Sequence, residues 1–397
     1  MNRNVEVVVV GGGYGGVTAA NSLARRDGVS VTLVNPRPRF VQRIRLHQLV
    51  TGSDDAVESF GEVLGGNVRL VVDTASRIDT AERQVSLAGG DTLSYDYLVY
   101  AVGSGASDPG VPGAAQFAHS VSDLEGAQRL RSALAATPAS GPVTVVGAGP
   151  TGLETAAELA ELGRKVTLVC GDVLGPSLHA RVRRPVARRL ARLGVTVLEG
   201  PGARVAEVTS DGVRLDDGRE VAGAVTIWTA GFRVPDLAAR SGLRTDTAGR
   251  LVTDATLTSV DDPRIVAAGD AAVITDRHFR MSCQAAVQLG PGAAATLLRR
   301  IAGKTPAPVR LLFAGQCLSL GRNEGVTQFS YPNDKVNALS ISGRPGAGVK
   351  EIACRFTTRQ LVSGARKAGS RTTAGAGRTE ATRPEDHTTP TSTRRSA

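Results

Sequence analysis

The sequence predicts an α/β protein with parallel sheets, because an ordered block of strand, glycine turn, helix and strand occurs twice in its 397 residues. The first block is VEVVVVGGGYGGVTAANSLARR followed by VSVTLVN, and the second is PVTVVGAGPTGLETAAELAELG followed by KVTLVC. Buried strands that flank a helix in this order form βαβ units, which require a parallel sheet. A β-rich stretch follows each block and closes in YAVG or WTAG. We interpret this order as an internal repeat, with two domains built on one plan.

Composition supports a folded protein of this kind. Hydrophobic residues make up 41% of the chain and charged residues 21%, which is typical of soluble globular proteins. No apolar run approaches the roughly 18 residues needed to cross a bilayer. The N-terminal apolar stretch is interrupted by Glu6 and leads into a glycine turn instead of a signal-peptide cleavage site. We therefore expect a cytoplasmic protein and leave contact with a membrane surface open.

Cysteine spacing and charge exclude several other classes. Cys170, Cys283, Cys317 and Cys354 form no CxxC pair and no metal-ligand spacing, so we expect neither dithiol chemistry nor a metal site. The formal net charge is +10, and the segment from 358 to 397 contributes eight basic and three acidic residues to it. We interpret this balance as a modestly basic enzyme with a basic tail, without specific binding of nucleic acid.

The first glycine turn has the GxGxxG spacing of a dinucleotide-binding loop, with Gly11, Gly13 and Gly16 between a strand and a helix. A Cβ at the first two positions would obstruct the turn or the approach of a pyrophosphate, and the third glycine lets helix and strand pack closely. The free N–H groups and partial positive charge of the helix N-terminus then favour phosphate. This context predicts a bound dinucleotide.

The second turn repeats the spacing with Gly147, Gly149 and Gly152, so we expect two dinucleotides. The acidic residue that normally binds the ribose should follow the last glycine by roughly 20 residues. Asn35 and Cys170 occupy that position in the two blocks. Asn35 retains hydrogen-bonding capacity, with less strength than a carboxylate. Asp172 is a candidate for a ribose hydroxyl in the second block, and a solvated turn aspartate is an equally good interpretation.

A third motif makes the pattern specific. Thr258 precedes, after six residues, the apolar run Ile265 to Ala268 and the pair Gly269 and Asp270. Two fingerprints, two closing glycine turns and this Gly-Asp element together resemble the FAD-dependent pyridine nucleotide oxidoreductases with two dinucleotide-binding domains. That resemblance implies two Rossmann-like domains, with the NAD domain inserted in the FAD domain, a small C-terminal mixed domain and a disordered tail.

The resemblance also implies domain boundaries and binding residues. We expect FAD-binding parts at 1–118 and 244–303, the NAD(P)-binding domain at 119–243, a mixed C-terminal α/β region at 304–357 and a disordered basic tail at 358–397. The expected FAD contacts are Gly11, Gly13, Gly16, Asn35, Arg37, Gly103, Gly269 and Asp270. The expected NAD contacts are Gly147, Gly149, Gly152, Glu154, Asp172 and Gly231.

The missing CxxC separates this chain from the disulfide reductases. Its GPTGLE fingerprint and the segment Cys283-Gln284-Ala285-Ala286-Val287-Gln288 are similar to type II NADH dehydrogenases, which carry an AQxxxQ segment beside the flavin and the quinone pocket. Gln284 and Gln288 are therefore candidates for the acceptor site, although two glutamines one helical turn apart also fit plain decoration of a helix. The amphipathic membrane helices usual in those enzymes are not evident after Leu311.

The resemblance implies that hydride passes from NAD(P)H to FAD and that electrons leave to a quinone-type small acceptor. NADH is slightly favoured, since no basic residue stands at Cys170 or Gly171. A homodimer is compatible with the sequence. Two alternatives remain: a soluble reductase of a ferredoxin or small biosynthetic substrate, and a redox-responsive binding protein that resembles apoptosis-inducing-factor relatives. The five histidines are interpreted as surface residues, and only His47 belongs to a segment expected near the flavin.

Overall fold

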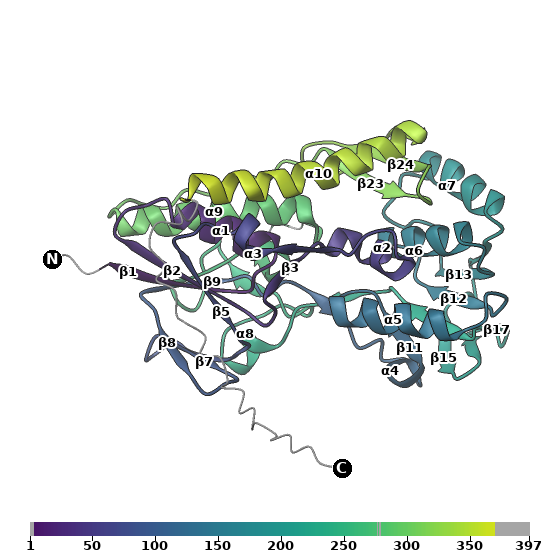
Figure 1. The fold of residues 1–397 in the computed structure, drawn as a ribbon, viewed down its shortest axis with the longest axis horizontal. Helices are drawn as coiled ribbons and strands as arrows, with labels where there is room; N and C mark the ends of the chain where they lie inside the picture. Colours follow the sequence, from purple (N-terminus) through teal and green to yellow (C-terminus); the bar gives the residue numbers. More distant parts are fainter. Residues whose placement is uncertain (1–3, 276, 278, 370–397) are drawn as a thin grey trace, which may run out of the picture.

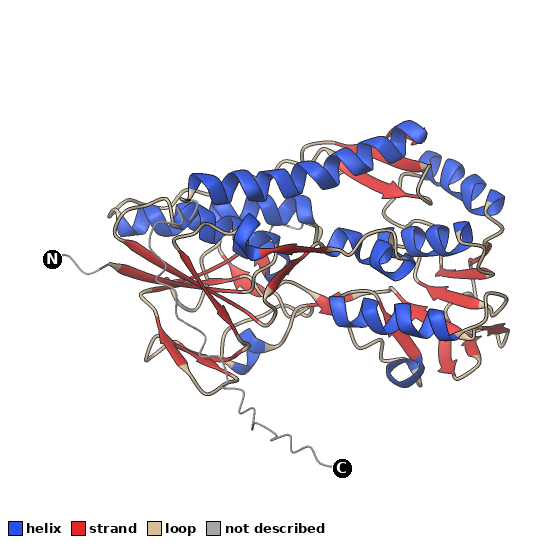
Figure 2. Cartoon of the chain, in the orientation of Figure 1, coloured by secondary structure: helices blue, strands red, loops and turns tan. Residues whose placement is uncertain are grey.

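The computed structural model describes residues 4–275, 277 and 279–369. Two five-stranded parallel sheets form the two halves of the molecule (Figures 1 and 2). The first sheet has the strand order β21-β9-β1-β2-β5. Its strands are β1 (Val5–Val10), β2 (Val29–Asn35), β5 (Val68–Val72), β9 (Tyr97–Tyr100) and β21 (Ile265–Ala267). The predicted first βαβ unit is confirmed, and the late strand β21 brings the chain back into this sheet.

Two helices of the first half pack closely against each other. They are α1 (Tyr14–Leu23) and α9 (Cys283–Ile301). The contact depends on Gly290, whose Cβ, if present, would stand 2.0 Å from the Thr18 hydroxyl. Ser282 caps α9 by accepting the N–H of Ala285 at 3.2 Å, which fixes the start of the helix at Cys283.

Smaller elements complete the first half. They are β3 (Arg39–Val41), η1 (Arg43–Arg45), α2 (Leu46–Thr51), β4 (Val57–Ser59), α3 (Phe60–Val63), β6 (Ala75–Asp79), β7 (Gln84–Leu87), β8 (Thr92–Ser94), β10 (Gly105–Ala106), β19 (Phe232–Arg233), α8 (Leu237–Arg240), β20 (Leu251–Thr253), η2 (Gly269–Ala271) and β22 (Ala272–Ile274).

The second sheet has the order β11-β18-β12-β13-β14 and is parallel throughout. Its strands are β11 (Ala118–Ser120), β12 (Val143–Val146), β13 (Val166–Gly171), β14 (Thr196–Glu199) and β18 (Val225–Trp228). The elements around it are α4 (Ala114–Phe117), α5 (Leu124–Ala136), α6 (Pro150–Glu161), α7 (Ala180–Arg192), β15 (Val205–Thr209), β16 (Gly212–Leu215) and β17 (Glu220–Ala222). Together the two sheets confirm the predicted α/β fold class with repeated Rossmann-like units.

The largest apolar cores follow the two sheets, with one exchange between them. Leu46, Leu49 and Val50 of α2 belong by sequence to the first half, yet they pack into the core of the second sheet. Leu318 and Leu320 join the same core from the C-terminal region. The second core is therefore built from three separate stretches of the chain.

The C-terminal region is an antiparallel sheet followed by one long helix. Its strands are β23 (Gly315–Ser319), β24 (Gly325–Ser330) and β25 (Val336–Gly343), and α10 extends over Arg344–Lys367. In Figure 1 α10 runs along the top of the molecule, above α9 and α1 and toward α7.

The prediction that a structureless tail begins at 358 is wrong, because α10 continues to Lys367. Leu361 is fully buried, and the N–H of Gly66 donates to the Gly369 carbonyl at 2.7 Å. A start rich in proline and glycine concealed this helix, because those residues usually mark a turn. The rest of the predicted tail, 370–397, lies outside the described residues.

Candidate functional site

The two glycine fingerprints have nearly the same geometry. The first glycines, Gly11 and Gly147, have φ angles of 105° and 106°, a region that residues with a Cβ rarely adopt. The third glycines, Gly16 and Gly152, pack so tightly that a Cβ would stand 1.8 Å from the carbonyl oxygen of the first glycine in each loop. Both loops therefore hold helix against strand in the way that the motif predicts.

The middle glycines face open space. Gly13 and Gly149 precede the first residues of α1 and α6, and a Cβ at either position would meet no atom within 4 Å. The unpaired N–H groups of each helix start and its partial positive charge therefore border an uncovered volume. Each site fits a pyrophosphate.

Asp270 supplies a second observation that fits FAD at the first fingerprint. Its Oδ2 accepts hydrogen bonds from the Ser104 hydroxyl at 2.7 Å and from Arg43 at 3.3 Å. Its Oδ1 is buried and has no hydrogen-bond partner. A buried carboxylate oxygen without a partner is costly, so it is suited to a hydroxyl group of a bound molecule. Gly269, directly before Asp270, lies against Gly15 of the fingerprint. A Cβ built at Gly269 would stand 3.8 Å from the Cα of Gly15.

Three other predicted FAD contacts already have partners within the chain or lie beside the site. The Asn35 amide accepts the N–H of Gly12 at 2.9 Å and donates to the Arg37 carbonyl at 2.7 Å, so it holds the loop in place. Arg37 forms an ion pair with Glu125. Gly103 adjoins Ser104 and faces open space. Direct contact of Asn35 and Arg37 with FAD stays a prediction.

The predicted NAD contacts divide into exposed and buried groups. Asp172 follows β13 and is exposed, with its Oδ2 2.6 Å from the Arg204 guanidinium. Gly231, with a φ of 83°, lies after β18 beside the second fingerprint. Glu154 is 5% exposed and points away from solvent. Its carboxylate is partnered inside the protein, and its contact with NAD stays a prediction.

Glu154 belongs to a buried polar cluster that sequence reasoning missed. Its Oε1 lies 2.9 Å from the Lys350 ammonium and accepts the N–H of Ser319 at 3.0 Å. Burial by itself would raise the pKa of Glu154, but Lys350, His47 and the Ser319 N–H outweigh that effect and lower it. The pKa of Lys350 is raised because Glu154 outweighs the opposing effect of burial. The pair is therefore ionised at neutral pH.

His47 lies between two carboxylates of α6. Its Nδ1 is 3.8 Å from Glu154 and its Nε2 is 3.4 Å from Glu158. The ring is 3% exposed, so the interpretation of His47 as a surface residue is wrong. Burial lowers the pKa of His47 to about 4, with Lys350 and Arg322 adding to the effect, so the ring is neutral at pH 7. The apolar residues around the histidine in RIRLHQLV were the available signal.

The two glutamines predicted for the acceptor site are hydrogen-bonded to the segment that leads into β23. Gln288 donates to the Leu312 carbonyl at 2.9 Å and accepts the Leu312 N–H at 3.0 Å. The Gln284 amide, with its N and O atoms assigned from their surroundings, donates to the Gly315 carbonyl at 3.2 Å and accepts the Ala314 N–H at 3.1 Å. Both amides hold the chain at 312–315 against the start of α9.

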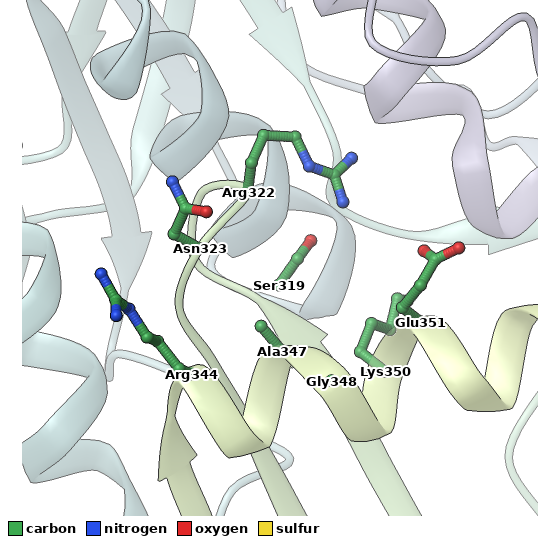
Figure 3. Close-up of a pocket in the computed structure, with 8 residues that line it drawn as sticks. All are labelled: Ser319, Arg322, Asn323, Arg344, Ala347, Gly348, Lys350 and Glu351. Carbon is green, nitrogen blue, oxygen red and sulfur yellow. The ribbon is translucent and has the colours of Figure 1, made fainter.

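A pocket of about 410 Å³ opens beside the buried cluster (Figure 3). Its walls come from the first two turns of α10 and from β23 with the loop that follows it. The lining residues are Ser319, Arg322, Asn323, Arg344, Ala347, Gly348, Lys350 and Glu351. Lys350 and Ser319 of the buried cluster thus line a pocket that also contains the basic side chains of Arg322 and Arg344.

Comparisons with known proteins identify relatives of this arrangement. The family model described as pyridine nucleotide-disulphide oxidoreductase matches residues 5–290. An NADH dehydrogenase-like protein of Mycobacterium tuberculosis is 32% identical over 79% of this chain and 85% of its own length. A type II NADH:quinone oxidoreductase of the same organism is 29% identical over 86% and 81%. The crystal structure of the sulfide:quinone oxidoreductase from Aquifex aeolicus superposes with a TM-score of 0.78 at 21% identity, covering 91% of this chain and 92% of that one.

Proposed function

The chain belongs to the pyridine nucleotide-disulphide oxidoreductase family, and from this premise we propose that it oxidises NADH with FAD as cofactor and passes the electrons to a quinone. The observation that carries the proposal is the pair of open helix N-termini at Gly13 and Gly149, one on each sheet. Two separate pyrophosphate sites suit one resident and one exchanging dinucleotide. The relatives named as NADH dehydrogenases and NADH:quinone oxidoreductases support the choice of donor and acceptor.

Bound FAD would supply the redox chemistry, as the carrier of two electrons between NADH and the acceptor. The chain positions both dinucleotides by their phosphates, through the N-termini of α1 and α6. Asp270 offers its unpaired Oδ1 to FAD, and Arg43 and Ser104 orient that carboxylate. The first residues of α9 direct a helix N-terminus at the same region, which favours negative charge there.

We place the acceptor where α9 and α10 approach the first fingerprint. Cys283 is the first residue of α9, and its pKa is raised chiefly by burial. The charge of Lys350 lowers this pKa and that of Asp270 raises it, so both groups act on the same region. The Lys350 ammonium is then the buried cation available to a quinone oxygen, with Glu154 holding it in place. Gln284 and Gln288 remain acceptor-site residues in this proposal, in a positioning role, since their amides fix the wall at 312–315.

An exposed apolar surface supports contact with a membrane, where quinones dissolve. Leu312, Tyr331, Leu339, Ile352 and Phe356 are each more than half exposed, and all come from the C-terminal region. Ile352 and Phe356 lie one turn apart on α10, opposite its buried residues Lys350, Cys354 and Leu361. None of the helices in the described part of the chain is long and apolar enough to cross a bilayer. We propose peripheral attachment through this surface.

Vesicle flotation tests the attachment. The protein should float with vesicles that contain anionic lipid, and Ile352→Ser combined with Phe356→Ser should remain at the bottom of the gradient while keeping its flavin. Leu162→Ser, a matched change at an apolar residue that is 62% exposed and directly follows α6, should float normally. The contrary outcome is a wild-type homodimer, a monomeric double variant and no vesicle binding by either protein. That result would assign this surface to subunit contact.

An acceptor screen tests the proposed function. With NADH as donor, turnover with a short-chain quinone should exceed turnover with ferredoxin. NADH should give a higher kcat/KM than NADPH, because the Asp172 carboxylate after β13 suits a ribose hydroxyl and opposes a 2′-phosphate. Arg204, which pairs with Asp172, is the residue that would reverse this preference. Faster turnover with ferredoxin would favour the soluble-reductase alternative, and absence of turnover with every acceptor would favour the redox-responsive binding protein.

A further inference from the structure

A line of hydrogen-bonding side chains leads from the surface of α2 to the interior. Ser53 is exposed, and its hydroxyl lies 3.3 Å from the hydroxyl of Thr51. The Thr51 hydroxyl is 2.8 Å from Oε2 of Glu158, closer than to either backbone carbonyl within its reach, those of His47 at 3.3 Å and Gln48 at 3.1 Å. The shortest bond therefore has Thr51 donating to Glu158, the orientation in which a proton moves inward.

The line continues from Glu158 to the acceptor side. Oε1 of Glu158 is 3.4 Å from Nε2 of His47, and Nδ1 of His47 faces Glu154 at 3.8 Å. The hydroxyl of Ser319 links the same two residues through the other ring nitrogen, at 3.2 Å from Nε2 of His47 and 3.3 Å from Oε1 of Glu154. Glu154 ends at the Lys350 ammonium, 2.9 Å away. Each gap is short enough for proton transfer after small side-chain movements.

The charges along the line suit a carrier of protons. Burial raises the pKa of Glu158, although Arg322 and the Thr51 hydroxyl oppose that shift, while Glu154 and Glu161 add to it. His47 is neutral, and it faces Glu154 as well as the cations Lys350, Arg322 and Arg45. A neutral imidazole accepts a proton on one nitrogen and releases one from the other. Oε1 of Glu158 lies 3.4 Å from Nε2 of His47 and 3.3 Å from the Arg322 guanidinium, so this oxygen faces both the ring and a cation.

We propose that Glu158 and His47 form a proton path from Thr51 and Ser53 at the surface to Glu154 and Lys350 at the acceptor site. The inference rests on the proposed function. Reduction of a quinone to a quinol takes two electrons and two protons, and the hydride of NADH carries both electrons and one proton. The second proton comes from water, so one proton per turnover must enter the protein.

The transfer moves protons and no electrons. The O–H bond of Glu158 breaks as an N–H bond forms at Nε2 of His47. The Nδ1 proton of His47 passes to Glu154, and from there a proton reaches the acceptor oxygen. Glu158 regains its proton from water through the hydroxyls of Ser53 and Thr51. Glu158 and His47 are positioning residues for this proton and do not contact the acceptor.

The first test separates the two half-reactions in a stopped-flow instrument. Glu158→Gln should keep the rate at which NADH bleaches the flavin, because hydride transfer needs no proton from water. Recovery of the flavin absorbance on mixing with a quinone should be slower by roughly 10²-fold, the usual contribution of a proton-transfer group. Imidazole added at mildly acidic pH should restore part of this rate in the variant and leave the wild-type rate unchanged.

Matched variants keep the proposal falsifiable. Glu161→Gln makes the same change one turn further along α6. The Glu161 carboxylate accepts the N–H of Arg322 and pairs with Arg189, outside the proposed path. The flavin absorbance of this variant should therefore recover at the wild-type rate. Thr51→Val removes the hydroxyl bridge at nearly constant volume and should slow recovery of the flavin absorbance as Glu158→Gln does. This variant also keeps the path testable if Glu158→Gln fails to fold. Recovery at the wild-type rate in Glu158→Gln or Thr51→Val would overturn the path. A wild-type protein that quinone does not re-oxidise would instead contradict the proposed function.

A second readout does not depend on turnover. The infrared carbonyl band of a protonated buried carboxyl should persist in the resting protein to a higher pH than an ordinary glutamate allows, because the pKa of Glu158 is raised. The band should disappear in Glu158→Gln and remain in Glu161→Gln. A spectrum identical in wild type and Glu158→Gln would show that Glu158 holds no proton, which excludes it as a carrier.

Discussion

Replacing Lys350 by methionine is expected to lower the free energy of unfolding by roughly 3–5 kcal/mol, the usual cost of leaving one member of a buried ion pair alone. Glu154 would keep the Ser319 N–H but lose the ammonium 2.9 Å away. Urea denaturation at pH 7 measures the change. Combining Lys350→Met with Glu154→Gln removes both charges and should restore most of the lost stability, whereas an additive double variant would contradict the pairing.

The same variant should respond to pH in a defined direction. In the wild type the pKa of Glu154 is lowered from its ordinary value of 4.5, so the stability that the pair contributes is present above that value and is lost as the pH falls through the folded-state pKa. In Lys350→Met the buried carboxyl prefers its neutral form. The difference in unfolding free energy between the two proteins should therefore narrow as the pH falls, first above about 4.5, where the variant's carboxyl takes up a proton, and then below it, where the wild-type pair is lost.

Gly149→Val is expected to leave FAD bound and to slow bleaching of the flavin by NADH by at least roughly 10²-fold, since a misplaced substrate loses that much or more. The φ of Gly149 is −70°, so valine fits the backbone, and its methyl groups enter the open space before α6. Dithionite should still bleach the flavin. The matched change Gly13→Val, at a φ of −80°, should instead yield protein without flavin. Loss of flavin from Gly149→Val, with NADH binding intact, would reverse the two assignments.

Much of the fold could be predicted because its signals are local. Strands of consecutive valines, glycines at fixed spacing and the capping Ser282 lie within short windows of sequence, and each maps to one backbone requirement. The position of Asp270 was predictable for the same reason, because a short motif marks it. Its unpaired Oδ1 was not, since it depends on how Arg43 and Ser104 approach from distant parts of the chain.

The polar cluster had no such signal. Glu154 and Lys350 are brought together only by the path of α10 over the molecule, and a lone lysine in GAGVKE reads as a surface residue. The hydrogen bonds of Asn35 and Gln288 were equally hidden, because a side-chain amide can bind a ligand or a neighbouring backbone with the same chemistry. Only the tertiary packing decides which partner it finds.

The placement of α2 in the second core has a consequence for how the molecule unfolds. Leu46, Leu49 and Val50 cover apolar surface of the second sheet, and Leu318 of β23 does the same from the other end of the chain. Segment 119–243 taken alone would leave that surface in water. Since the second sheet completes its core with residues of α2 and β23, local opening of the first half also exposes apolar area of the second, and the two sheets behave as one cooperative unit.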